Sequence, residues 1–169
     1  MFRGINSATL DAKGRMALPV RFRDSVQAPA AGNQAPAAGE APPVQSPSGG
    51  SVVVTINVGE RCLLLYPLRE WEVVQRKLEA LPNMEENTRQ LQRLLIGHAT
   101  DIDVDSQGRI LLPAMLRDYG GLEKKLVLVG QGNKIEVWDA DHWQERMSVW
   151  MAKDSGLRTD SAALMSLSF

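Results

Sequence analysis

A ten-residue pattern occurs twice in this chain, and it limits the possible folds more than any other feature. Residues 10–19 read Leu-Asp-Ala-Lys-Gly-Arg-Met-Ala-Leu-Pro, and residues 104–113 read Val-Asp-Ser-Gln-Gly-Arg-Ile-Leu-Leu-Pro. Aspartate bonds to nearby backbone amides, glycine supplies positive φ, and proline ends the strand that follows. Each copy therefore predicts a β-hairpin that presents an arginine, Arg15 in the first and Arg109 in the second.

The repeat extends beyond the hairpins. Leu65-Tyr66-Pro67 with Trp71 corresponds to Val137-Trp138-Asp139 with Trp143. This later spacing is shorter than that of the hairpins, because the first half contains an extra loop. Residues 27–50 are rich in Ala, Pro, Gly and Ser and have little to bury, so we expect a disordered insertion there. Its role is left open: it is either a docking segment or, as the simpler interpretation, a tolerated surface insertion.

These patterns predict an α+β fold built from two duplicated β-α-β-β-α half-units. The expected boundaries are 1–82 for the first half-unit, 83–98 for a connecting helix, 99–152 for the second half-unit and 153–169 for a C-terminal tail. A chain of 169 residues is long enough for two small halves that share one core.

Composition favours a soluble protein in a reducing compartment. No apolar run approaches the roughly 18 residues of a membrane helix, and the lone Cys62 cannot form an internal disulfide. The net charge is −1, but residues 1–26 carry five Lys or Arg against two Asp. Residues 135–169 have the opposite balance, so positive charge gathers around the first hairpin. We therefore expect a cytoplasmic protein without a membrane partner.

Catalytic chemistry is not indicated. The sequence contains no Gly-rich phosphate loop with a lysine, and its His and Cys residues lack the spacing of a metal site. His98 and His142 are interpreted as surface or packing residues, and Cys62 as a buried, inert thiol. We expect no enzyme activity, no cofactor, no metal and no small-molecule substrate.

The two arginines are the better candidates for function. A rigidly held guanidinium suits phosphate oxygens or the O6/N7 edge of guanine, and a two-stranded ribbon fits the major groove of DNA. A single hairpin of this kind is interpreted more simply, with the arginine solvated or bonded to its own aspartate. Two copies in matching frames, with Lys13, Arg21 and Arg23 around the first, favour a binding site.

The chain resembles the MraZ family of bacterial transcriptional regulators, within the wider AbrB-like swapped-hairpin superfamily. The resemblance covers essentially residues 1–150 and rests on Met1 to Gly4, Asp11 to Arg15, Cys62 to Pro67, Arg93 to Ala99, Asp105 to Arg109 and Leu128 to Gln131. It implies two half-units packed about a pseudo-two-fold axis as a swapped-hairpin β-barrel with flanking helices. It also implies homo-oligomeric rings that bind direct repeats in promoter DNA.

Several residue roles are carried over from this resemblance. DNA contact falls on Lys13, Gly14 and Arg15, and by analogy on Gly108 and Arg109. DNA contact is also carried over to Arg21 and Arg23, because they match the basic residues at the start of a helix in the superfamily. Gln107 replaces Lys13 and Met115 replaces Arg21 in the second half, which suggests that the two halves are not equivalent on DNA.

The resulting hypothesis is a sequence-specific DNA-binding regulator associated with the nucleoid. The resemblance implies repression of the protein's own division and cell-wall gene cluster, through tandem promoter repeats bound by a ring. The alternative is an oligomeric scaffold whose hairpins bind protein or RNA. Protection of regularly spaced DNA repeats, weakening with salt, would favour the first.

Overall fold

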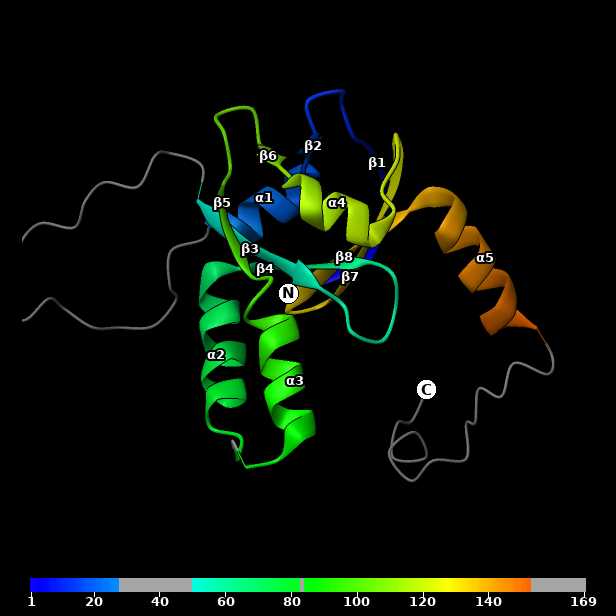
Figure 1. Ribbon diagram of the computed structural model, residues 1–169. Helices are drawn as coiled ribbons and strands as arrows, with labels where there is room; N and C mark the ends of the chain where they lie inside the picture. The colour runs from blue at the N-terminus through cyan, green and yellow to red at the C-terminus, as the bar shows by residue number, and fades with distance from the viewer. Residues whose placement is uncertain (28–49, 83, 153–169) are drawn as a thin grey trace, which may run out of the picture. The chain divides into compact units, whose positions relative to one another are not determined.

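The computed structural model describes residues 1–27, 50–82 and 84–152 (Figure 1). Most of the predicted insertion and the predicted tail at 153–169 lie outside the described residues. Contacts group the chain into two compact units, Met1–Asp139 and Ala140–Phe169. The second unit is described through α5 (Ala140–Met151), in which the rings of Trp143 and Trp150 meet edge to face at 5.8 Å.

The same order of elements, β–β–α–β–β–α, occurs in each half of the chain. The first half contains β1 (Phe2–Thr9), β2 (Arg15–Ala17), α1 (Val20–Gln27), β3 (Ser51–Ile56), β4 (Leu63–Pro67) and α2 (Leu68–Glu79). After α3 (Glu86–Leu95), the second half contains β5 (Thr100–Asp103), β6 (Arg109–Leu111), α4 (Ala114–Gly120), β7 (Lys125–Gly132), β8 (Lys134–Asp139) and α5.

The strands form one large sheet and one short ribbon. The six-stranded sheet has the order β1-β7-β8-β4-β3-β5, while β2 and β6 form a separate two-stranded ribbon. Every pairing in the described residues is antiparallel. The predicted α+β class is confirmed, but the described residues form no closed β-barrel, in contrast to the barrel that the family resemblance implies. Strands β1 and β5 each pair with a single neighbour and leave the large sheet open at both edges.

The strand after each turn does not return along the strand before it, contrary to the hairpin prediction. Strand β1 pairs with β7 along its whole length, and only a single bridge joins Leu10 to Met16. Strand β2 instead pairs with β6, with Met16 opposite Ile110. This pairing is favoured because it places both side chains in one core, where Met16 is fully buried and Ile110 is 1% exposed.

The main core lies on one face of β3, and a smaller cluster lies on the other. Val52, Val54 and Ile56 join the main core, whereas Val53 packs with Tyr66 of β4. Trp71 of α2 completes this smaller cluster, its ring 5.7 Å from that of Tyr66. The turns at 11–14 and 105–108 project at one end of the first unit, whereas α2 and α3 extend from the opposite end (Figure 1).

Candidate nucleic-acid interface

Asp11 organises the first turn and holds Arg15. Its Oδ1 accepts hydrogen bonds from the backbone N–H groups of Lys13 and Arg15, each at 2.9 Å. Its Oδ2 accepts the Nε–H of Arg15 at 2.7 Å. Gly14 has φ +82°, which a residue with a side chain rarely adopts, so the predicted role of glycine in this turn is confirmed.

The second turn repeats this geometry. Oδ1 of Asp105 accepts the backbone N–H groups of Gln107 and Arg109, and Oδ2 accepts the Nε–H of Arg109 at 2.8 Å. Gly108 has φ +73°. Each arginine therefore bonds through Nε to the aspartate of its own turn. This is one of the two arrangements that the simpler interpretation of the hairpins predicts.

The same contacts favour the ionised form of each aspartate and lower its pKa. The backbone N–H of Arg15 and then its side chain lower the pKa of Asp11 below its ordinary value of 3.8. The corresponding groups of Arg109 lower the pKa of Asp105 in the same way. A carboxylate that stays charged holds its guanidinium in one orientation, as a rigid binding group requires.

The bond through Nε leaves the outer edge of each guanidinium available. Within the described chain, the two terminal nitrogens of Arg15 and Arg109 have no hydrogen-bond partner. The two side chains are 34% and 32% exposed, so they are neither fully buried nor extended into solvent. The outer edge is the pair of donors that a phosphate or a guanine accepts in a bidentate contact.

The β2–β6 ribbon places both arginines on one face. Arg15 is opposite Leu111, and Arg109 is opposite Ala17. Paired residues, and residues two apart on a strand, share a face, so these four side chains lie opposite to buried Met16 and Ile110. Arg15 and Arg109 are diagonal neighbours, with α-carbons roughly 7–8 Å apart. The duplicated motif therefore forms one composite surface.

Two further arginines brace the turns, each from the other half of the chain. Nε of Arg117 donates to the carbonyl of Leu112 at 3.1 Å, and a Cβ built on Gly14 would lie 2.9 Å from Cζ of Arg117. Arg23 is arranged reciprocally. It donates to the carbonyl of Leu18 at 2.6 Å, and its guanidinium occupies the space beside the α-carbon of Gly108.

The ends of the ribbon join the same two turns. The N–H of Leu18 donates to the carbonyl of Gly108, and the N–H of Leu112 donates to the carbonyl of Gly14, both at 2.9 Å. Both glycines are buried. Each turn is therefore held by its own aspartate and by a backbone bond and an arginine from the other half.

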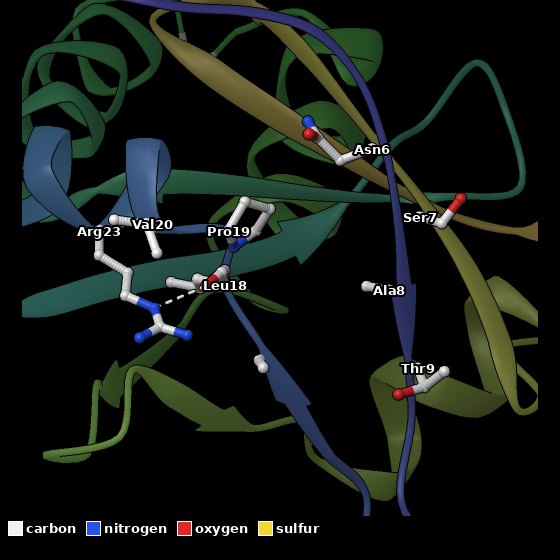
Figure 2. Close-up of a pocket in the computed structure, with 9 residues that line it drawn as sticks. Asn6, Ser7, Ala8, Thr9, Leu18, Pro19, Val20 and Arg23 are labelled. Carbon is white, nitrogen blue, oxygen red and sulfur yellow. Dashed lines mark hydrogen bonds between the residues drawn. The ribbon is translucent and has the colours of Figure 1, made fainter.

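An open groove of about 510 Å³ borders the ribbon, between β1 and the start of α1 (Figure 2). One wall is formed by β1, and the other includes Arg23 with its bond to the carbonyl of Leu18. Nδ2 of Asn6 is buried and has no partner in the described residues. The groove is lined by residues that include Asn6, Ser7, Thr9, Ala17, Leu18 and Arg23.

The structure brings together the residues predicted as DNA contacts in the two turns. The other predicted contacts, Arg21 and Arg23, lie on α1. Lys13 and Gln107 are exposed at the turns, close in sequence to Arg15 and Arg109. Arg21 is exposed on α1, with its guanidinium 5.1 Å from the ring of Phe22. Arg23 is half-buried as a brace. Arg117 was not singled out from the sequence, although Arg23-Asp24 and Arg117-Asp118 follow the two motifs at equivalent positions.

The described residues offer no group of metal-binding side chains comparable to these arginines. In the described ranges, no three His, Cys, Asp or Glu side chains are grouped to hold a metal ion. Nδ1 of His98 is 2.8 Å from the carbonyl of Leu94, and Cys62 is fully buried. None of the helices in the described residues is long and apolar enough to cross a membrane.

The chain is similar to proteins of one family along nearly its whole length. The family model described as "MraZ protein, putative antitoxin-like" matches residues 95–161. A protein named "Transcriptional regulator MraZ" from Marinomonas sp. (strain MWYL1) is 45% identical over 168 residues, or 99% of each chain. Proteins of the same name from Halorhodospira halophila (strain DSM 244 / SL1) and Legionella pneumophila (strain Paris) are 47% and 43% identical. They cover 89% and 93% of this chain, and 88% and 91% of their own length.

Proposed function

Because this chain belongs to the MraZ family, we propose that it is a sequence-specific DNA-binding transcriptional regulator that binds tandem promoter repeats. Its relatives are named transcriptional regulators, and the site described above offers chemistry suited to DNA. In finer detail, the proposal is a repressor of the protein's own division and cell-wall gene cluster. It acts in the cytoplasm at the nucleoid.

The observation that carries this proposal is the set of four arginines anchored through Nε. Each uses Nε to bond to an aspartate or a carbonyl of the protein, and its terminal nitrogens have no hydrogen-bond partner in the described residues: Arg15, Arg23, Arg109 and Arg117. A guanidinium that is already oriented loses less conformational entropy on binding than a free side chain. This pre-organisation supports binding of the phosphates or guanines of a duplex.

The reciprocal contacts also support the proposed pseudo-two-fold arrangement of the half-units. Arg23 and Arg117 occupy equivalent positions and brace opposite turns, and the ribbon register is centred on the pair Met16 and Ile110. Such symmetry would present Arg15 and Arg109 to neighbouring positions on a duplex. Gln107 in place of Lys13 leaves the second turn with less positive charge.

A homo-oligomeric ring completes the proposal. One subunit offers few phosphate contacts, and the protein has a net charge of −1, so affinity from a single ribbon is modest. Several ribbons held in a ring contact successive repeats at high effective concentration, which multiplies the affinity. This explains how a nearly neutral chain binds a polyanion through local cationic surfaces.

Nuclease footprinting on the DNA upstream of the protein's own gene tests the proposal. We expect protection at regularly spaced repeats, with affinity that falls as salt is raised. If the four arginines and Lys13 all touched phosphates, the slope of log K against log salt would approach about −4.5 per subunit. Light scattering on the same sample reports the assembly. An absence of protected repeats, with binding to RNA or protein instead, would favour the scaffold alternative.

A further inference from the structure

Leu111 is an exposed leucine between the two arginines of the ribbon. It is 55% exposed and pairs directly with Arg15 across the strands. The motif repeat places Ala17 at the equivalent position of the first half, opposite Arg109. One arginine thus has a large apolar neighbour, whereas the other has a small one.

The geometry places the leucine side chain beside that of Arg15. Directly paired residues point to the same face of an antiparallel ribbon, with Cβ atoms roughly 4.5–5.5 Å apart. The opposite face carries Met16 and Ile110, which are buried in the core. Leu111 is therefore on the surface that the proposed function brings against DNA. It is close enough to Arg15 to reach the same base pair or the next, because successive base pairs are about 3.4 Å apart.

Few groups of a DNA duplex suit an apolar side chain at this position. Phosphates and the polar base edges offer it only charge and hydrogen bonds. The C5-methyl group of thymine is the apolar feature of the major groove. An arginine that contacts guanine beside a leucine that contacts a thymine methyl would read two neighbouring positions together.

We propose that Leu111 is a specificity-determining residue that contacts a thymine methyl group next to the position contacted by Arg15. This inference rests on the proposed DNA binding and deepens it. Ala17 is too short to make the equivalent contact beside Arg109, so the two sides of the ribbon discriminate unequally. The difference gives the site a direction along the duplex.

Single replacements of thymine by deoxyuridine in the protected duplex test this contact. Deoxyuridine keeps the base pairing and the phosphate charge and removes only the methyl group. For the wild-type protein, we expect one position at which the replacement weakens binding about four-fold, the effect of one buried methyl-sized group. Leu111→Ala should bind the unmodified duplex about as weakly and lose the response to deoxyuridine.

Matched variants separate this contact from a general loss of apolar surface. Met115→Ala, also at an exposed residue, should keep the wild-type response. Leu111→Asn, which keeps the shape of leucine but not its apolar character, should behave as Leu111→Ala. Ala17→Leu should create a second position that is sensitive to deoxyuridine. Circular dichroism and light scattering confirm that each variant is folded and assembled.

Three results would overturn the inference, and one of them also overturns the proposed function. If the wild-type protein binds the duplex but is indifferent to every replacement, Leu111 reads no methyl group while DNA binding stands. If Leu111→Ala keeps the wild-type response, or changes only the assembly, the leucine is a contact between subunits. If the wild-type protein binds none of its upstream DNA, both proposals fail.

Discussion

Arg117 lies against the α-carbon of Gly14, so that the second half of the chain supports the turn that presents Arg15. A side chain on Gly14 would meet Cζ and Nε of Arg117, each at 2.9 Å. Arg23 makes the reciprocal contact with Gly108. Neither turn is complete within its own half of the sequence, and this coupling explains why both glycines are buried.

Gly14→Ala should therefore destabilise the protein and weaken DNA binding. The alanine must adopt a positive φ, which costs roughly 1–3 kcal/mol, and its methyl group must displace the guanidinium of Arg117. Urea unfolding and an affinity measurement report the two effects. Gly59→Ala is the control, because its Cβ would meet nothing closer than 3.7 Å. Similar losses in both variants would mean that the brace has no special role.

Asp11→Asn tests whether Asp11 acts on DNA binding by positioning Arg15 or only through its negative charge. The change removes a negative charge from a surface that we propose meets DNA, so electrostatics alone predicts tighter binding. The geometry predicts the opposite, since the carboxylate holds Nε of Arg15. We expect affinity to fall by up to about five-fold, the upper end for an exposed ion pair. Asp24→Asn, on α1, removes an exposed charge outside this turn and should leave binding unchanged or tighten it. Tighter binding by Asp11→Asn would exclude a positioning role.

The ion pairs of the two turns should be insensitive to pH until the solution is strongly acidic. The pKa values of Asp11 and Asp105 are lowered from 3.8, first by the backbone N–H groups of Arg15 and Arg109. A lowered pKa means that the stabilisation is fully present above 3.8 and is lost as the pH falls through the lower, folded-state value. The NMR signals of both arginine Nε–H groups should therefore stay unchanged around neutral pH and shift only in acid, with midpoints below 3.8. A titration near neutral pH would contradict this assignment.

Cys62 should be unreactive in the folded protein. Burial raises its pKa from 9.0 to about 12, and its Sγ accepts a hydrogen bond from Nδ2 of Asn57 at 3.4 Å. The thiolate, which is the reactive form, is then scarce at neutral pH. A thiol reagent should modify the native protein only at the rate of unfolding, and the urea-unfolded chain at once. Rapid modification of the native protein would show that the segment just before β4 opens locally.

Local features of the site could be predicted from the sequence, whereas its long-range contacts could not. The bonds from Asp11 span at most four residues, and the positive φ of Gly14 follows from the turn itself. The partner of β2 was predicted wrongly, because a strand of three residues with buried Met16 suits β1 or β6 equally well on pattern alone. Arg117 was missed because the repeated Arg-Asp pair marks its position but does not indicate that its side chain contacts Gly14.

The fold shows the same limit. Alternation and turn residues predicted the order of strands and helices, and hence the α+β class. Barrel closure depends on the edge strands meeting, which no local pattern encodes. In the structure, β1 and β5 remain at opposite edges of the six-stranded sheet. Trp71 and Leu78 are the buried residues of α2, and Trp71 packs against Val53 and Tyr66 of the sheet.

The central claim, that oriented arginines on the β2–β6 ribbon bind DNA, is tested most directly by alanine substitution. Affinity for the protected upstream duplex should be measured for the wild-type protein, Arg15→Ala, Arg109→Ala and Arg76→Ala. A bidentate contact contributes roughly 1–3 kcal/mol in each subunit, and a ring multiplies the loss. We predict that Arg15→Ala abolishes binding without changing the assembly, and that Arg109→Ala, beside neutral Gln107, has a smaller effect. Arg76→Ala, on α2 away from the turns, should bind as the wild-type protein does. Wild-type affinity in Arg15→Ala would contradict the account.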